Sequence, residues 1–432
     1  MNTMKLKSIF KICLLAMLIV ACKDDAKEKP VEETTVEFSF NVEQFADIKI
    51  LRYQIPGWEN LSLKEQKLVY YYNLYNGDKT TNDWKEFTIY LKRVWFSNGI
   101  HHHYSNDKLK PGFNEEYLNE LFTATNTKLD GAAFNVMFND EDIKKVNQAK
   151  GVDNVALSAV NFYGPDVTSD DVINFYKTKT SPNADRPLSY GLNSQLVKED
   201  GVLKERVYKS GGLYGAAIDN IIEWLGKARG VAENDAQGNA IDLLIKYYTT
   251  GDLQTWDDYN VAWTAATAGN VDYINSFIEV YNDPLGYRGS YETIVQINDF
   301  DMSKKMAVLS ENAQWFEDNS PLMEEHKKDN VVGVSYKVVT VAGEAGDASP
   351  STPIGVNLPN ANWIRKEIGS KSVSLGNITY AYSNAGSSGR LKEFVHDEEE
   401  LKLEEEFGGL ADKLHTALHE VVGHASGQLN KG

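Results

Sequence analysis

The sequence is nearly devoid of cysteine: it has two in 432 residues. These are Cys13 and Cys22, and both lie within the first 22 residues. The rest of the chain therefore has neither a disulfide framework nor a zinc site built from thiolates. Any metal site there must use other side chains, chiefly histidine and carboxylates.

Basic residues are also scarce relative to acidic ones, with 44 Lys and Arg against 62 Asp and Glu and a formal net charge of −18. Such a balance disfavours nucleic acid as a partner, because few cations are left to neutralise phosphates. It equally disfavours electrostatic docking on anionic lipid. With 42% hydrophobic residues, the chain can bury a large core, and its length fits two domains or one two-lobed unit.

The longest early apolar run, residues 13–20, follows three lysines and is too short to span a membrane. Such a run is typical of an export signal. The residues Ile19-Val20-Ala21 before Cys22 resemble a bacterial lipobox. We therefore expect residues 1–22 to be a lipoprotein signal peptide, with Cys22 lipidated and the polar segment 23–36 a flexible tether. The protein would then be an outer-membrane lipoprotein facing the periplasm or the exterior. An ordinary secretory signal is the alternative.

The chain shows no internal repeat, and its apolar spacing changes between strand and helix periods. Strands are expected at 36–40, 48–53 and 331–341. Helices are expected from the capping-box residue Ser62 to Gly77, over 218–225 and over 241–248. A loop is expected at 343–353, and a solvated helix face or connector at 397–408. The fold class is therefore α+β and helix-rich.

The strongest chemical signal is the segment from His419 to His424, in which Glu420 follows the first histidine. Two imidazoles and a carboxylate on one helix can hold zinc and activate water. The histidines are five residues apart, which separates them by about 140° on a regular helix, too far for one metal ion. A local bulge must absorb the extra residue, and Gly423 is where it costs least.

Other histidines offer rival interpretations. His415 lies four residues before His419, on the same helix face, so this pair is an alternative ligand set. It gives Glu420 no evident role, however. The run His101 to His103 cannot direct three consecutive side chains at one ion, so we expect it to be structural or to line a cleft.

The motif from His419 and two further segments resemble the dipeptidyl peptidase III family of zinc peptidases. The supporting segments are residues 277–292, with the sequence FIEVYNDP at their start, and residues 357–360, with 373–377 downstream. They occur in the order found in the family, and the resemblance extends from about Trp58 to the C-terminus. It implies a two-lobed α+β peptidase with a β-barrel in the lower lobe and a helical zinc-binding upper lobe.

The resemblance assigns roles to the central residues of the site. His419 and His424 bind Zn²⁺, and Glu420 is the general base that activates water. Tyr281 hydrogen-bonds the scissile carbonyl as it becomes an oxyanion, a task that suits a preorganised phenol donor. The third zinc ligand of the family is a glutamate on a helix that follows the motif.

The resemblance also implies a site for the free N-terminus of a peptide. Glu279, Asn357 and Asn360 match positions that hold this ammonium group, and Glu292 is placed in the same cleft. A carboxylate with amide oxygens is a suitable partner for an ammonium ion. Anchoring the N-terminus at a fixed distance from zinc would release dipeptides. Without the resemblance, turn chemistry around Pro359 would explain both asparagines equally well.

Only eight residues follow His424, so we expect a C-terminally truncated chain whose third ligand lies beyond Gly432. Glu404, Glu405 or Glu406 could replace that ligand only if the fold departs from the family. Such a chain would bind zinc poorly and turn over little.

The expected lower lobe comprises residues 37–299 and 338–385, and the upper lobe comprises 300–337 and 386–432. The expected function is zinc-dependent release of N-terminal dipeptides from short peptides by an enzyme tied to the membrane through its lipid. The alternatives are a non-catalytic peptide-binding lipoprotein and a zinc endopeptidase without an N-terminal anchor.

Overall fold

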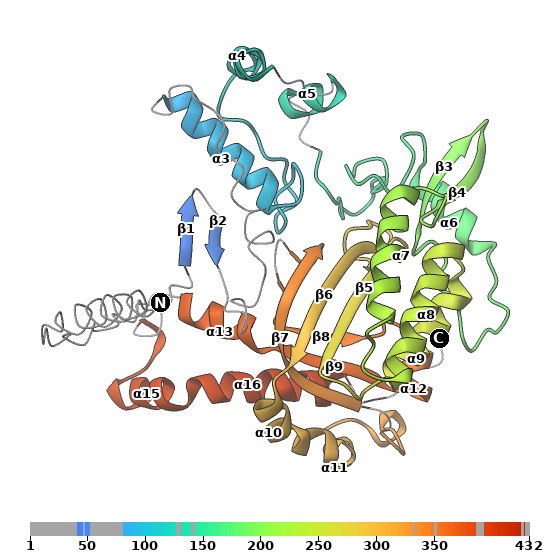
Figure 1. Ribbon diagram of the computed structural model, residues 1–432, viewed down its shortest axis with the longest axis vertical. Helices are drawn as coiled ribbons and strands as arrows, with labels where there is room; N and C mark the ends of the chain where they lie inside the picture. The colour runs from blue at the N-terminus through green and yellow to red at the C-terminus, as the bar shows by residue number, and fades with distance from the viewer. Residues whose placement is uncertain are drawn as a thin grey trace, which may run out of the picture. The chain divides into compact units, whose positions relative to one another are not determined.

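The computed structural model describes residues 41–45, 48–51, 81–126, 131–139, 143–331, 334–349, 352–385, 393–424 and 427 (Figure 1). The chain divides into two units, Met1–Ser39 and Phe40–Gly432, and all described residues belong to the second. The expected signal peptide, the tether, the strand at 36–40 and the helix beginning at Ser62 lie outside the described residues.

A five-stranded sheet forms the centre of the fold, and its strand order is β5-β6-β7-β9-β8. The strands are β5 Val271–Glu279, β6 Ser290–Asn298, β7 Val334–Gly346, β8 Gly355–Leu358 and β9 Ser370–Leu375. Neighbours are antiparallel except β7 and β9, which run parallel. Since β5 and β8 are both edge strands, the expected barrel is an open half-barrel.

Strand β7 confirms the run expected at 331–341 from Val334 onward and extends further, to Gly346. Residues 343 to 346 pair with Glu292 to Val295 of β6. The prediction that a loop begins at Gly343 was therefore wrong, because the strand continues to Gly346. Glycine and alanine in this stretch suggested a loop, but pairing with a neighbouring strand outweighs their weak preference.

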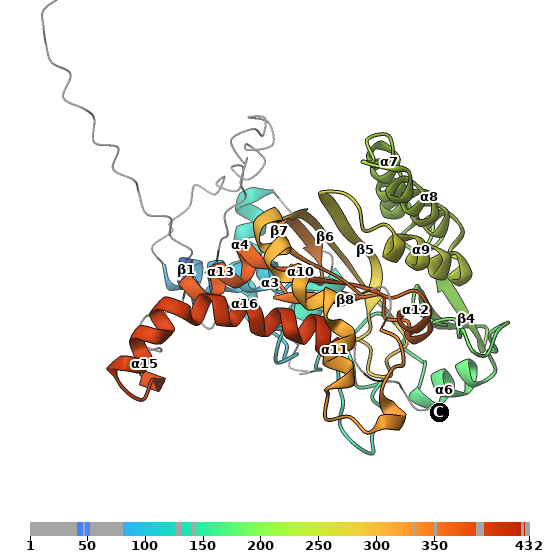
Figure 2. The same ribbon diagram turned by 90° about the horizontal axis from the view of Figure 1, so that it is seen from below.

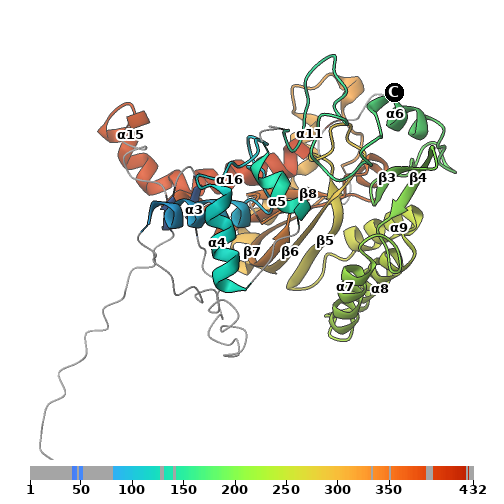
Figure 3. The same cartoon turned by 90° about the horizontal axis from the view of Figure 1, so that it is seen from above.

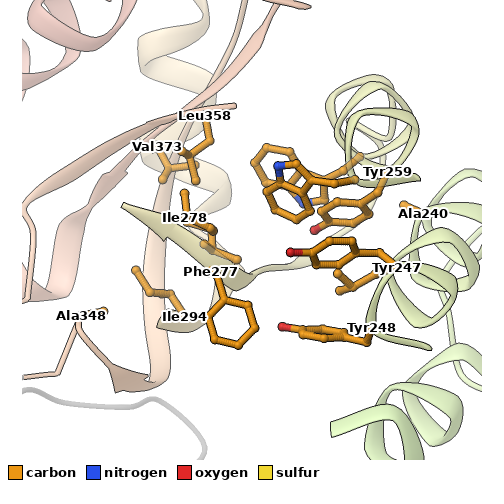
Figure 4. Close-up of a cluster of buried hydrophobic side chains, with 14 of the residues drawn as sticks. Ala240, Tyr247, Tyr248, Tyr259, Phe277, Ile278, Ile294, Ala348, Leu358 and Val373 are labelled. Carbon is orange, nitrogen blue, oxygen red and sulfur yellow. The ribbon is translucent and has the colours of Figure 1, made fainter. Parts of the chain in front are cut away.

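Three helices pack against one face of the sheet. They are α7 Gly215–Arg229, α8 Asp235–Thr250 and α9 Leu253–Ala265, so both helices expected here are confirmed. Asn234 caps α8 by accepting from the backbone N–H of Gln237, and Gly251 ends it at φ 70°. Figure 4 shows tyrosines of these helices pointing toward Phe277 and Ile278 of β5. Figure 3 shows the three helices side by side.

Helices α10 Phe300–Glu311 and α16 Gly409–Leu418 pack against the opposite face, where they form a second core cluster. Val338 of β7 belongs to this cluster, whereas Val339 belongs to the first. Successive strand residues point to opposite faces, so the sheet lies between two helical layers. Figure 2 shows α10 beside α16. This packing fixes the segment that follows α16.

The remaining elements surround this centre. They are β1 Asn41–Phe45, β2 Ile48–Leu51, α3 Asn82–Phe96, α4 Glu115–Thr125, α5 Gly131–Phe138, α6 Ser169–Lys177, β3 Ser194–Glu199, β4 Val202–Val207, α11 Ala313–Asp318, the 3-10 turn η2 Glu324–His326, α12 Asn362–Glu367, α13 Gly376–Ala385, α15 Glu398–Leu403 and the π-turn η3 Glu404–Gly408. The acidic stretch 397–408 is helical and mostly exposed, as expected. Across the described residues, every helix is too short or too polar to traverse a lipid bilayer.

Candidate metal centre and adjoining cleft

The segment His419–Gly423, η4, is a π-helical turn that continues α16. The backbone N–H of His424 donates to the carbonyl of His419, five residues earlier. This hydrogen bond absorbs the extra residue between the histidines, so the expected bulge is present. The two imidazole rings lie with centroids 5.0 Å apart and planes at 84°.

Ligand atoms of His419, Glu420 and His424 all lie within 4.8 Å of one another. Within the described residues this is the one cluster of three such side chains, and it contains neither His415 nor the glutamates 404–406. Partial burial, then His419 and Arg365, lower the pKa of His424 and favour the neutral ring that binds metals. Two nitrogen donors at this separation fit zinc.

The Glu420 carboxyl is 5% exposed, and its Oε2 has no hydrogen-bond partner. Burial raises its pKa to about 7, against a lowering by Arg365. The hydroxyl of Ser372 donates to the Glu420 carbonyl at 3.1 Å and ties η4 to β9. A buried oxygen without a partner, beside two imidazoles, can accept a proton or approach a metal ion.

Gly355, the first residue of β8, was missed by sequence reasoning. A methyl group on its Cα would lie too close to the Glu420 carboxylate, which would have to shift, so glycine here leaves the carboxylate its place. No local pattern marks the position, because the contact joins residues 65 positions apart in the sequence.

Glu279, Tyr281 and Asn360 come together at the other end of β8. The Asn360 amide donates to Glu279 Oε1 at 2.9 Å. Burial raises the pKa of Glu279, and the hydrogen bonds from Asn360 and Tyr281 oppose this rise. Tyr281 is 76% exposed, and the neighbouring Glu279 raises its pKa. Its hydroxyl is therefore a protonated donor at neutral pH, accessible from solvent.

Asn357 and Glu292 are more deeply buried. Asn357 is 8% exposed, and its amide donates to Ser370 at 3.1 Å and to Ser372. Since Ser372 in turn donates to the Glu420 carbonyl, hydrogen bonds connect Asn357 to Glu420 through this serine. Its Oδ1 has no partner. Burial raises the pKa of Glu292 to about 8, and Glu279 contributes to the rise. Asn357, buried against serines of β9, and Asn360, paired with Glu279, therefore occupy different environments.

Arg365 of α12 is a second residue that the sequence reasoning missed. Its guanidinium donates to the carbonyls of Pro359 at 2.7 Å and Asn357 at 2.9 Å, and to Asn360 Oδ1 at 3.0 Å. Burial lowers its pKa, opposed by Glu279, Tyr281 and Glu420 in that order. Arg365 thus holds the turn after β8 by hydrogen bonds and acts electrostatically on the carboxylates of Glu279 and Glu420.

A cavity of about 790 Å³ opens beside Glu279, Tyr281 and Asn360 and continues along α9. A second cavity of about 480 Å³ is lined by Tyr281 and by His103. The ring of His103 stacks on that of His102 at 4.9 Å between centroids. His103 therefore lines a cleft, which is one of the two roles expected for this run of histidines.

Comparison with known proteins gives consistent matches. The model of peptidase family M49 matches residues 140–431, about two thirds of the chain. A dipeptidyl peptidase 3 from Nematostella vectensis is 30% identical over 236 residues, covering 55% of this chain and 31% of that protein. One from Dictyostelium discoideum is 26% identical over 375 residues, covering 80% and 51%. This chain therefore spans about a third to a half of these curated relatives.

A solved structure shares the fold. The structure of DPP III from Caldithrix abyssi superposes with a TM-score of 0.53 at 20% sequence identity, covering 82% of this chain and 65% of that one. This agreement extends to the α+β arrangement expected from the sequence.

Proposed function

Because the chain belongs to peptidase family M49, we propose that it is a zinc-dependent dipeptidyl peptidase that releases dipeptides from the N-termini of short peptides. The observation that supports this most directly is the unpaired, buried oxygen of Glu420 beside His419 and His424. The relatives from Nematostella vectensis and Dictyostelium discoideum are both called dipeptidyl peptidase 3.

His419 and His424 would hold the zinc ion. When bound, zinc supplies a Lewis acid that polarises a carbonyl and lowers the pKa of water. Glu420 would take a proton from the attacking water and deliver it to the leaving amine. Gly355 leaves room for its carboxylate.

Glu279 and Asn360 would bind the substrate's α-ammonium group, and Glu292, whose pKa is raised to about 8, would lie in the same cleft with its carboxyl mostly protonated. Tyr281 would donate to the carbonyl oxygen as negative charge develops there. Asn357, whose Oδ1 has no hydrogen-bond partner, would contribute an amide oxygen to the same ammonium site. Strand β8 starts at Gly355 beside Glu420 and leads to Asn360, so it links the two halves of the site.

The test is hydrolysis of a dipeptidyl-naphthylamide by zinc-loaded protein, compared with the same substrate acetylated on its N-terminus. We expect release of naphthylamine from the free substrate alone. The substitution Glu420→Gln should reduce kcat at least 100-fold, whereas Glu398→Gln, an exposed control on α15, should leave it unchanged. Full activity in Glu420→Gln would refute the role of this base.

The same experiment separates the alternatives. A non-catalytic peptide-binding lipoprotein would bind the free peptide without hydrolysis and hold no stoichiometric zinc. A zinc endopeptidase would cleave acetylated peptides as readily as free ones. Either result would replace the proposed function.

The lobes and the membrane anchor belong to the same proposal. The proposed lobes are a helical one made from 300–337 and 386–432, in which α10 and α16 contact each other, and a sheet lobe made from 37–299 and 338–385. Lipidation of Cys22 would tie the protein to the outer membrane. Metabolic labelling with a fatty acid should mark the wild-type protein and not Cys22→Ser, and equal labelling of both would contradict it.

A further inference from the structure

Tyr281 lies in the loop 280–289, which joins β5 to β6. The backbone N–H of Asp283 donates to the carbonyl of Val280 at 3.0 Å, so Tyr281 and Asn282 are the two central residues of a β-turn. Of these four residues, Tyr281 is the one that is exposed. Its side chain gains little from packing, and the position of its hydroxyl therefore depends on how firmly the backbone of the turn is held.

Asp283 ends this turn and organises the rest of the loop. It is 3% exposed. Its carboxylate accepts hydrogen bonds from three backbone N–H groups, those of Leu285 at 3.1 Å, Tyr287 at 2.7 Å and Arg288 at 2.8 Å. An aspartate that accepts from the backbone just after it holds a turn in one conformation. The loop is therefore built around one buried acidic side chain.

Tyr163 holds Asp283 from a segment 120 positions earlier in the chain. Its hydroxyl donates to the carboxylate and lies 2.8 Å from Oδ1 and 2.9 Å from Oδ2. Burial and the neighbouring Asp283 raise the pKa of Tyr163, so the phenol keeps its proton and stays a donor at neutral pH. Hydrogen bonds to a charged group are among the stronger ones in proteins. The Asp283 carboxylate is thus fixed from outside its own loop.

Arg288 fixes the far end of the loop. It is fully buried, and its Nη1 donates to the carbonyl of Gly191 at 2.8 Å. The rings of Tyr163 and Tyr176 lie 5.1 Å and 4.8 Å from its Cζ, within reach of a cation–π attraction. Gly191 has a φ of 92°, and a methyl group on its Cα would overlap the guanidinium. A buried cation in so closely fitted a site restrains the loop that carries it.

Asn282, the residue after Tyr281, is tied to the neighbouring strands. Its side-chain amide donates to Ser290 Oγ at 2.9 Å and to Asp347 Oδ2 at 2.8 Å. Ser290 begins β6, and Asp347 follows the end of β7. The turn is therefore anchored both at its second central residue and at its last residue, Asp283.

We propose that Asp283, with Tyr163 as its hydrogen-bond donor, is a positioning residue that places the Tyr281 hydroxyl for the developing oxyanion. This inference rests on the proposed function, in which Tyr281 donates to the carbonyl oxygen of the scissile bond. A hydrogen-bond donor contributes to catalysis only when it is preorganised, and a displacement of about 1 Å can cost about 100-fold in rate. Asp283 acts through Tyr281 and takes no part in bond breaking.

The first test measures how firmly the loop is held, by hydrogen exchange and mass spectrometry on metal-free protein. Tyr163→Phe removes one hydroxyl and keeps the aromatic ring. Amide hydrogens of residues 283–288 should exchange about tenfold faster than in the wild type, because a hydrogen bond to a buried carboxylate is lost. Tyr90→Phe is the matched control and should not change this exchange, since Tyr90 is also buried and its hydroxyl has no hydrogen-bond partner. Unchanged exchange in Tyr163→Phe would overturn the proposal.

The second test asks whether this anchoring acts through Tyr281. In zinc-loaded protein, Tyr163→Phe should lower kcat for the dipeptidyl-naphthylamide about tenfold and change KM less than about twofold. In a Tyr281→Phe background the same substitution should change kcat less than about twofold, because the hydroxyl that is positioned is already absent. A tenfold loss in both backgrounds would overturn the positioning role. A wild-type protein without hydrolysis, together with faster exchange in Tyr163→Phe, would refute the proposed function and still support Asp283 as the anchor of this turn.

Discussion

Glu317 offers the sharpest test of how the fold holds the metal segment. It lies in α11, is fully buried and accepts hydrogen bonds from two backbone N–H groups. Its Oε1 accepts from Lys328 at 2.7 Å and from Gly427 at 3.0 Å, and Oε2 lies 3.2 Å from the same Gly427 nitrogen. Gly427 follows His424 by three residues. Glu317 therefore anchors the backbone just after the second candidate ligand.

Replacing Glu317 by alanine removes the acceptor of both N–H groups, which are part-buried in the fold. A hydrogen bond to a charged group contributes about 1.5–3 kcal/mol, so the substitution should lower the free energy of unfolding by about 3–6 kcal/mol. Glu317→Gln keeps the shape and one acceptor oxygen, and should lose about half of that amount. Because His424 loses its anchor, zinc affinity should fall about tenfold in the alanine variant.

The assays are urea unfolding and competition for zinc with a chromogenic chelator. Glu311→Gln, at an exposed position at the end of α10, is the control and should match the wild type in both. The reasoning is refuted if Glu317→Ala unfolds at the same urea concentration as this control and binds zinc with the same Kd.

Three further predictions follow from the site. Gly355→Ala should lower kcat at least tenfold with unchanged zinc content, because the new methyl group displaces the Glu420 carboxylate; metal analysis beside steady-state kinetics checks this. Asn360→Ala should raise KM about tenfold with little effect on kcat, since it removes the partner of Glu279; a reversed pattern in steady-state kinetics would contradict it. In the folded protein the pKa of Asp257 is about 7, against an ordinary value of 3.8. Its protonation therefore stabilises the fold fully below pH 4, and this stabilisation, at most ~4 kcal/mol, is lost as the pH rises through 7. In urea unfolding, the free energy of unfolding of Asp257→Asn should therefore fall less between pH 5 and pH 8 than that of the wild type. An equal fall in both proteins would contradict this assignment.

Local pattern was sufficient for several features. Helical apolar spacing identified α7 and α8, because each buries one stripe of side chains whatever its neighbours are. The five-residue spacing of His419 and His424 required a bulge, and the π-turn supplies it within a single helix. Both are short-range consequences of helix geometry. They can be worked out from residues within two turns of each other.

Other features depend on long-range contacts and have no local signature. Strand β7 continues through a glycine-rich stretch because β6 pairs with it, and this pairing joins residues about 50 positions apart. Asn357 and Asn360 lie three residues apart in sequence, yet one is buried against the serines of β9 and the other meets Glu279. Strand alternation and the turn after β8 separate them.

The sequence alone determined the family, the candidate zinc pair with its base and the need for a distorted helix, since each is written in the order and spacing of a few residues. Only the tertiary structure decided that Arg365 donates to the turn after β8, that Gly355 lies against Glu420 and that Asp257 is among the residues lining a cavity with aromatic walls. These three arrangements arise where separate elements meet. Which side chains meet there depends on how helices and strands pack, and no short stretch of sequence contains that information.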